Sequence, residues 1–418
     1  MPTFSKLTIF FLFIFSTSLL VGCFDTEKIK PSGFNSDFVF DTNQSFEKYI
    51  DYTKENILKK GRLDLDRADA DKIVDWNAPF LLNPPKSCAA SEKKRGLLLI
   101  HGLSDSPFSM KSLGEHFQKK CFTVFGILLT GHGTRPGDLL EVSYKSWRNQ
   151  VKYAVAKLKE KVDAVYLGGF STGGVLAFDY ANIDQDIAGL ILIAPSFKLP
   201  FAASFAGAIK YFRPMISWYD NRDVVKYESL ALNGVAQLNK LLKVLDNSLS
   251  KSNLNTKKIK VFTAISYEDT TIDPIKSIDY LLDHIDLDKS KIVIYHQQDN
   301  QLPDRFLNKE NIIPIVSTMS TMSTAGTTGT AGEKKILNFS HVSLLHHPTN
   351  KWYGIDGEYR NCLHYEKDSE NRLSCQNQED VMRGEVTKKN LSKGVVARIT
   401  FNPMLEELFS SMDQFFNN

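Results

Sequence analysis

A serine at position 171 stands at the centre of the pattern G-x-S-x-G, a spacing typical of a nucleophile held on a sharp turn. Gly169 and Gly173 lie two positions to either side of Ser171. The apolar segment 164–167 precedes this pattern, and the helix-compatible segment VLAFDYA follows it. A strand-to-helix turn strains the backbone of its central residue, and small neighbours avoid the resulting clashes. Ser171 is therefore the candidate nucleophile.

A second chemistry-bearing segment is Ile100-His101-Gly102-Leu103, at the end of the first recognisable strand. The glycine lets the backbone turn, so that an amide can point at negative charge developing on an attacked oxygen. We expect the N–H groups of Leu103 and Thr172 to form this oxyanion hole. One such donor typically contributes about 3 to 4 kcal/mol to lowering the barrier.

Three segments carry a family resemblance, namely IHGLSDSPFSM, LLTGHGTRPGD and GGFSTGG. In this order and spacing they resemble the α/β-hydrolase superfamily, in particular the branch with monoacylglycerol lipases, carboxylesterases and serine aminopeptidases. The resemblance extends over roughly residues 80–350 and is most specific between 96 and 180. It implies a mostly parallel sheet with helices on both faces and a triad in the order serine, acid, histidine. It also implies that His101 and His132 serve loop structure.

The resemblance places the acid in the loop after the strand that ends near Ile265. The family usually has an aliphatic residue three positions after its acid, and Asp269 with Ile272 matches that pattern. Glu268 lacks this offset. Asp273 fits better as the cap of a helix that follows Pro274. We therefore expect Asp269 to be the acid.

The resemblance places the base at His341, because LNFSH (337–341) is similar to the strand end and Ser-His pair of the family. His346 and His347 lie five and six residues further on, in a His-Pro turn. Asp269 and His341 are 72 positions apart, whereas the family usually needs only a helix and a strand between them. This long gap leaves His296, directly after a strand, as a rival for the base.

The elements that must position these residues alternate along the chain. Short apolar runs suit strands buried on both faces of a parallel sheet; they are 96–100, 122–129, 164–167, 189–193, 259–265 and 291–295. Helix-period stripes are predicted at about 45–60, 147–158 and 275–282. Repeated strand–helix alternation predicts an α/β fold with a sheet covered on both sides.

Two insertions interrupt this alternation. The first, about 197–257, begins with the apolar and aromatic run PFAASFAGAIKYFRPMISW and continues as helix-like sequence. It is either a lid over an acyl-binding cleft or an ordinary helical subdomain, and both descriptions can hold at once. The second, 317–332, is a Ser/Thr/Gly-rich run that has little to bury, and we expect a flexible loop.

The overall composition is that of a globular protein. The chain has 418 residues, with 51 Lys and Arg against 48 Asp and Glu, which gives a formal net charge of +3. Such a balance argues against a nucleic-acid binder and against a disordered chain. No metal-ligand spacing stands out, and no cofactor is expected.

The N-terminus has the pattern of an export signal. Lys6 precedes the apolar run 7–22, which is short for a spanning helix but suits a signal-peptide core. The run ends in Leu-Val-Gly-Cys, which resembles the lipobox of bacterial lipoproteins, so the resemblance implies cleavage before Cys23 and acylation of its sulfur. The alternative is an uncleaved anchor. Phe24 after the cysteine implies an outer-membrane location if the cell is Gram-negative.

The four other cysteines are an even number, which suits an oxidising envelope compartment. Three pairings are possible. Cys88 and Cys121 precede neighbouring strands of the predicted sheet, and Cys362 and Cys375 bracket one short polar loop. We therefore expect these two disulfides rather than four reduced thiols.

The sequence thus predicts three regions: a signal peptide (1–22), a tether with an N-terminal helical segment (23–85) and a hydrolase domain (86–418). The expected function is a lipid-anchored serine hydrolase of the cell envelope. Its expected substrates are carboxylic esters with lipid-like acyl chains. The alternatives are a peptidase or amidase on the same triad, and a non-catalytic binding module that kept the fold.

Overall fold

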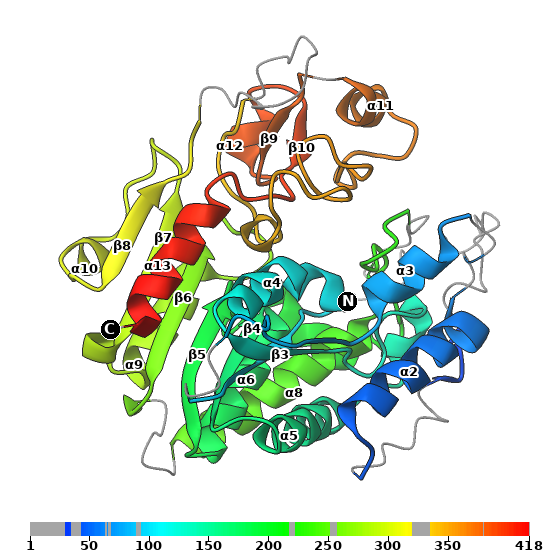
Figure 1. Cartoon of the computed structure of the whole chain (residues 1–418). Coiled ribbons are helices and arrows are strands. Elements are labelled where there is room, and N and C mark those ends of the chain that lie inside the picture. Colours follow the sequence, from blue (N-terminus) through cyan, green and yellow to red (C-terminus); the bar gives the residue numbers. More distant parts are fainter. Residues whose placement is uncertain are drawn as a thin grey trace, which may run out of the picture.

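A twisted eight-stranded sheet forms the centre of the computed structural model (Figure 1). The structure describes residues 30–34, 43–62, 65, 68–88, 93–216, 222–250, 257–319, 335–378 and 380–417. The predicted signal peptide, Cys23 and most of the 317–332 run lie outside these residues.

The strands of the sheet follow one another in the order β1-β3-β2-β4-β5-β6-β7-β8. β1 pairs antiparallel with β3, and all other pairs are parallel. The strands are β1 (Phe80–Leu82), β2 (Arg95–Ile100), β3 (Phe122–Ile127), β4 (Ala164–Phe170), β5 (Ile187–Ile193), β6 (Lys260–Ser266), β7 (Ser290–His296) and β8 (Ile312–Val316). The α/β-hydrolase fold expected from the sequence is confirmed.

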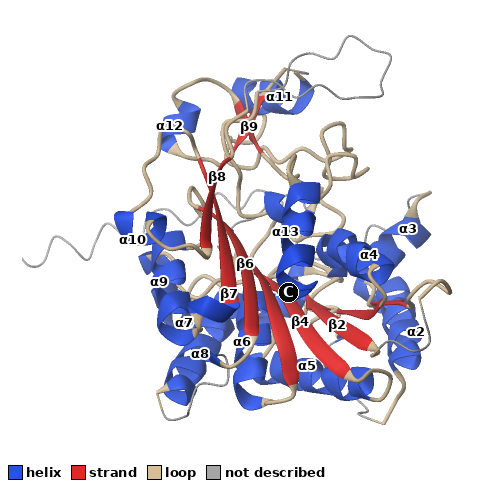
Figure 2. Cartoon of the chain, turned by 60° about the vertical axis from the view of Figure 1, so that its left-hand side comes forward, coloured by secondary structure: helices blue, strands red, loops and turns tan. Residues whose placement is uncertain are grey.

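Alternation along the strands builds a core on each face of the sheet. In β2, Leu98 and Ile100 point into one core, and Leu97 and Leu99 point into the other. The first core is covered by α2 (Phe46–Asn56), α5 (Tyr144–Lys159), α6 (Thr172–Ile183), α8 (Leu232–Leu249) and α9 (Pro274–His284). The second is covered by α4 (Lys111–Lys119) and α13 (Leu405–Asn417). Figure 2 shows α5 and α13 on opposite sides of the strands.

Helix boundaries follow local chemistry. The Ser143 hydroxyl accepts a hydrogen bond from the Lys145 N–H and begins α5, whose predicted apolar stripe is buried. Asp273 caps α9 in the same way, directly before Pro274 at the first helical position. This cap is the alternative role that the sequence suggested for Asp273.

Residues 197–250 form the first insertion, of which 217–221 are not described. A 3-10 turn (Phe201–Phe205) and the short α7 (Ala206–Ile209) precede α8. α8 packs on α5 and α6, whereas Ala206 packs with Leu232 and Val235 near Leu103. The insertion is therefore anchored by α8 and covers the turn after β2 with its first part.

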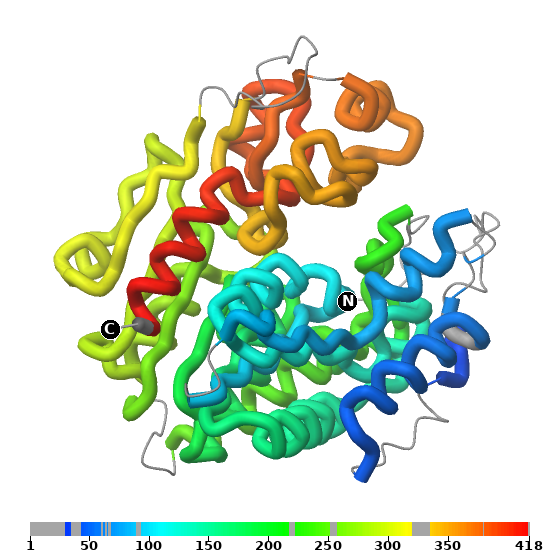
Figure 3. Tube along the Cα trace, viewed as in Figure 1, coloured from blue at the N-terminus to red at the C-terminus, as the bar shows by residue number. Residues whose placement is uncertain are grey.

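A second added unit lies between His341 and α13 (Figure 3). It contains α11 (Glu370–Asn377), α12 (Lys388–Leu391) and the parallel pair β9 (Met382–Gly384) and β10 (Val396–Arg398). We call residues 342–404 the C-terminal subdomain. Within the described part of the chain, no helix has both the length and the apolar character needed to cross a membrane.

Candidate active site

Ser171 lies on a strained turn between β4 and α6. Its backbone has φ 53° and ψ −115°, which places a non-glycine residue in the positive-φ region. The turn is so tight that a Cβ on Gly169 would lie 2.2 Å from the Gly173 carbonyl oxygen, and a Cβ on Gly173 would lie 2.0 Å from that of Ile100. Only glycine fits at either position, which is the physical reason for the G-x-S-x-G spacing.

The structure brings Ser171, His341 and Asp269 together as a hydrogen-bonded triad. We call these three side chains the hydrogen-bonded row. His341 Nε2 lies 2.9 Å from Ser171 Oγ, and His341 Nδ1 lies 2.5 Å from Asp269 Oδ2. All three residues are buried, with exposed fractions of 8%, 2% and 6% for Ser171, His341 and Asp269. This geometry lets the imidazole accept the serine proton while the carboxylate faces its other nitrogen.

The loop around Asp269 holds the carboxylate in place. Asp269 Oδ1 accepts hydrogen bonds from the N–H groups of Thr271 (2.7 Å) and Ile272 (3.1 Å), which leaves Oδ2 for the histidine. Glu268 instead accepts from the Gln297 N–H and the Asn300 side chain. Burial raises the pKa of Glu268, but its carboxylate is engaged away from the row.

The other histidines have different surroundings. His296, the rival base, has its Nδ1 3.1 Å from the Gln297 carbonyl oxygen at the end of β7. His101 Nε2 accepts from the Leu129 N–H, and the rings of His101 and His132 are in edge contact. Burial lowers the pKa of His132 to about 4 and that of His346 to about 3. These buried rings are neutral at ordinary pH, and those of His101 and His132 contact backbone groups of the turns that carry them.

Leu103 and Thr172 lie on either side of Ser171 and line the same cavity. Thr172 is the first residue of α6, so its N–H has no intrahelical acceptor. In the portion of the chain that the structure describes, no acceptor for the Leu103 N–H is present either. Both amides are therefore available to an oxyanion.

The cavity in front of Ser171 has a volume of about 710 Å³ and two chemically different walls. The apolar wall comes from the first insertion, α8 and the turn after β2; it includes Leu103, Leu199, Ala203, Ile209, Ile216, Leu230, Leu232, Val235 and Leu238. The polar wall comes from the 223–228 segment and the C-terminal subdomain; it includes Asp223, Lys226, Glu228, Tyr359, Asn361 and Arg398.

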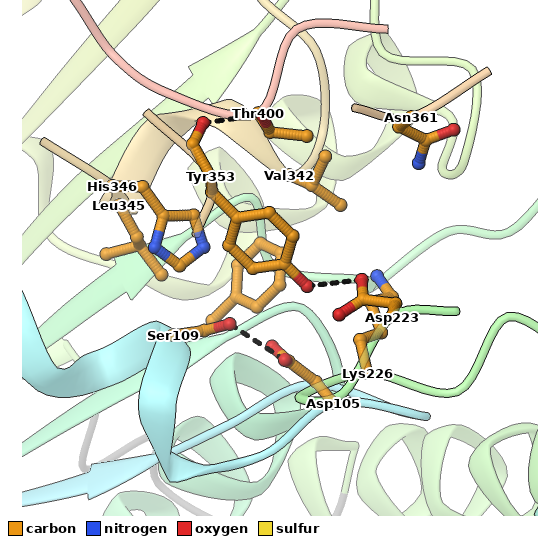
Figure 4. A pocket seen from close by; sticks show the side chains of 11 residues that line it. Asp105, Ser109, Asp223, Lys226, Val342, Leu345, His346, Tyr353, Asn361 and Thr400 are labelled. Carbon is orange, nitrogen blue, oxygen red and sulfur yellow. Dashed lines mark hydrogen bonds between the residues drawn. The ribbon is translucent and has the colours of Figure 1, made fainter. Parts of the chain in front are cut away.

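A smaller cavity of about 20 Å³ adjoins the first and shares Asp223, Lys226 and Asn361 with it (Figure 4). Ser109 Oγ donates to Asp105 Oδ1 (2.7 Å), and Tyr353 Oη donates to Asp223 Oδ2 (2.5 Å). Burial raises the pKa of Asp105, and it raises that of Asp223 to about 7. This space has room for about one water molecule, so we assign it to the packing of the 342–346 loop rather than to a substrate.

The residues of the polar wall could not be found from the sequence, because they belong to no motif and come from distant segments. The cysteines pair as Cys88–Cys121 and Cys362–Cys375. Among the described residues no cluster of His, Cys, Asp or Glu could hold a metal ion.

Comparisons with known proteins find hydrolases over part of this chain. Residues 91–275 match the family described as "Serine aminopeptidase, S33". A thermostable monoacylglycerol lipase of Bacillus sp. (strain H-257) is 29% identical over 185 residues, which cover 43% of this chain and 72% of that enzyme. A carboxylesterase of Bacillus subtilis (strain 168) is 24% identical over 131 residues, or 31% of this chain and 53% of the relative. A metagenome-derived lipolytic enzyme of known structure has a TM-score of 0.46 at 20% identity, over 52% of this chain and 87% of its own.

Proposed function

We propose that this chain, a serine hydrolase of the lipase and carboxylesterase type, cleaves carboxylic esters. Each ester would consist of an apolar acyl chain and a small polar alcohol. The observation that carries this proposal is the Ser171–His341–Asp269 row opening into a cavity with one apolar and one polar wall. The relatives described as a monoacylglycerol lipase and a carboxylesterase support the same class of substrate.

The proposed reaction has two halves. Ser171 Oγ attacks the ester carbonyl carbon while His341 Nε2 takes the serine proton, and the amides of Leu103 and Thr172 bind the oxyanion. His341 then delivers this proton to the leaving alcohol, and an acyl-enzyme remains on Ser171. Water, deprotonated by His341, releases the acid and restores the serine. Asp269 orients the imidazole and stabilises its cation.

The two walls support an assignment of the two halves of the ester. An acyl chain loses contact with water along Leu199, Ile209 and Val235, and each buried CH₂ contributes about 0.8 kcal/mol. Lys226 and Asn361 also line the cavity, and both side chains carry hydrogen-bond donors. Hydroxyl oxygens of a glycerol-like alcohol can accept from them. We therefore favour monoacylglycerol-type esters as substrates.

We further propose that the enzyme works at a membrane surface. The lipobox ending at Cys23 supports a lipid anchor, and multiple acyl chains give stable attachment. The first insertion adds exposed apolar side chains near the cavity, with Phe201 82% and Phe212 92% exposed. Residues 198–213 carry Lys198, Lys210 and Arg213 and no acidic residue, which suits an anionic lipid surface.

The test of the nucleophile is Ser171→Ala. We expect it to abolish turnover of p-nitrophenyl esters and labelling by a fluorophosphonate probe. Ser290→Ala is the matched control, because Ser290 is equally buried but donates its hydroxyl to the Asp286 carbonyl outside the row. Turnover and labelling that persist in Ser171→Ala would rule out the proposal.

The family description favours a second candidate, a peptidase on the same three residues. Nothing in the row itself separates an ester from an amide, since both pass through a tetrahedral oxyanion. A panel that compares acyl esters of p-nitrophenol with aminoacyl p-nitroanilides decides between them. Labelling by the probe without turnover of either class would instead favour a binding module.

A further inference from the structure

Glu385 and Arg398 form an ion pair in the C-terminal subdomain, beside the active-site row. Arg398 Nε lies 2.8 Å from Glu385 Oε1, and Arg398 Nη2 donates to Glu385 Oε2 at 2.9 Å. Glu385 is fully buried, with no exposed surface. The Nη2 contact is a hydrogen bond, whereas the Nε contact is an ion-pair distance without hydrogen-bond geometry. Arg398 Nη2 also reaches a second acceptor, which the single ammonium of lysine at the end of a flexible chain does not reproduce.

Each member of this pair also contacts one of the two loops that carry the acid and the base. On one side, Glu385 Oε2 accepts a hydrogen bond from the His341 N–H (3.2 Å). On the other side, Arg398 Nη2 donates to Thr271 Oγ1 (2.7 Å), and the Thr271 N–H donates to Asp269 Oδ1 (2.7 Å). A continuous path of hydrogen bonds therefore joins the backbone of His341 to the carboxylate of Asp269 without passing through the imidazole.

The subdomain holds the pair rigidly. β9 and β10 pair in parallel, with Gly384 opposite Arg398, so the residue after β9 and the last residue of β10 are adjacent. The disulfide Cys362–Cys375 packs with Val381 and Ala397, beside both strands. The positions of Glu385 and Arg398 are thus fixed by backbone pairing and by a covalent link.

We propose that Glu385 and Arg398 are positioning residues, which hold the Asp269 loop and the His341 loop at the separation that the hydrogen-bonded row requires. This inference rests on the proposed function of that row. Acid and base are 72 positions apart in the chain, and they must nevertheless keep a geometry in which a displacement of 1 Å can cost about 100-fold in rate. The C-terminal subdomain is then part of the catalytic apparatus and not an accessory unit.

A purely structural role is the competing explanation. Burying an ion pair costs desolvation energy that its attraction often does not recover, so the pair alone is weak evidence for stability. The two explanations differ in what a substitution changes. A structural pair affects the unfolding temperature alone, whereas a positioning pair affects the chemical step in protein that remains folded.

The experiment compares Arg398→Lys and Glu385→Gln with the same substitutions at a control pair. Arg148 Nε lies 2.8 Å from Asp179 Oδ2, and this pair joins α5 to α6 with the carboxylate likewise buried. Arg148→Lys and Asp179→Asn are therefore matched controls without contact to the row. The measurements are kcat and KM on p-nitrophenyl esters, the rate of fluorophosphonate labelling and the unfolding temperature.

We expect Arg398→Lys to lower kcat about 10- to 100-fold with KM little changed, because lysine keeps the charge but cannot bridge Glu385 and Thr271. We expect Glu385→Gln to lower kcat in the same way, because the amide lacks the charge that holds Arg398 in place.

Thr271→Val separates the two explanations if a charge variant unfolds. It removes only the hydroxyl that accepts from Arg398 at the exposed end of the path, and we expect a loss of kcat without a loss of unfolding temperature. The inference is overturned if Arg398→Lys and Glu385→Gln match their controls, and Thr271→Val matches the unaltered protein, in kcat and labelling rate at equal unfolding temperature. If the unaltered protein does not react with the probe at all, the proposed function fails, and this inference fails with it.

Discussion

At the scale of single residues, Asp269 has two oxygens with separate tasks. One oxygen is fixed by two backbone amides of its own loop, and the other faces His341 Nδ1. The two amide contacts fix the plane of the carboxylate independently of its contact with the imidazole. The position of the Asp269 carboxylate therefore depends on the backbone of its loop as well as on its charge.

This division predicts a large effect of Asp269→Asn. The amide keeps an acceptor for the loop but turns a donor toward His341, which favours the wrong tautomer. We expect kcat to fall about 10³- to 10⁴-fold, with little change in unfolding temperature. Asp273→Asn, which alters only the cap of α9, is the matched control. Activity retained in Asp269→Asn would transfer the acid role to Glu268.

The burial of His132 predicts how the free energy of unfolding depends on pH. Burial lowers the pKa of His132 to about 4, below the usual value of 6.5 for the unfolded chain. Between these two values the unfolded chain binds more protons than the folded one, so the free energy of unfolding falls as the pH falls from about 6.5 to 4. One such group contributes a slope of up to about 1.4 kcal/mol per pH unit. Urea unfolding from pH 7 to 4.5 should show a smaller slope for His132→Gln than for the unaltered protein, and an equal slope would contradict this assignment.

At the scale of elements, the strands and turns that local sequence patterns determine could be predicted from the sequence. The interior strands β2 and β4 to β7 are apolar runs buried on both faces, and the turn at Ser171 is specified by glycines that no other residue can replace. β1 and β8 could not be predicted. β1 has only three residues, and β8 contains Pro314, which is tolerated because β8 is the last strand of the sheet.

The parts of the site that depend on distant contacts could not be predicted either. Glu385, Arg398 and Lys226 lie in no motif, and only the fold brings them to the loops of Asp269 and His341. The family likeness located Ser171 and Asp269 by their spacing from the ends of β4 and β6, and it located His341 by the segment LNFSH, all of which are local patterns. The C-terminal subdomain has no such local signature.

We expect the two disulfides to contribute similarly to stability but differently to kcat. Each closed loop should contribute roughly 3 kcal/mol to the free energy of unfolding by the chain-entropy estimate. Replacing Cys362 and Cys375 by Ala should also lower kcat, because their disulfide supports β10 and Arg398. Replacing Cys88 and Cys121 is the matched control, because Cys121 precedes the amino end of β3 and lies away from the row. Equal kcat in the two double variants would refute the coupling.

At the scale of the whole molecule, the first insertion and the C-terminal subdomain close the cavity from two sides. The insertion supplies the apolar side chains and also three polar ones, Asp223, Lys226 and Glu228. The subdomain supplies Tyr359, Asn361 and Arg398. The exposed aromatic residues of the insertion lie beside the apolar wall, where an acyl chain leaving a bilayer would enter.

This arrangement predicts a difference between dispersed and membrane-held substrates. Phe201→Ser with Phe212→Ser should lower kcat/KM about tenfold for a monoacylglycerol presented in anionic vesicles, because less apolar surface enters the lipid. The rate on a soluble short-chain p-nitrophenyl ester should stay the same, since neither side chain lines the cavity. Leu373→Ser, at an exposed leucine of α11, is the control. An equal loss on both substrates would contradict a surface role.

The position of the C-terminal subdomain in the chain has a consequence for biosynthesis. Glu385 and Arg398 are translated after Ser171, Asp269 and His341, and α13, which seals one face of the sheet, is translated later still. A nascent chain that has emerged to residue 380 holds every reacting group and lacks the pair that we propose aligns them. Under the export that we propose, the precursor should therefore remain inactive toward membrane lipids until the subdomain has been delivered and its cysteines have been oxidised.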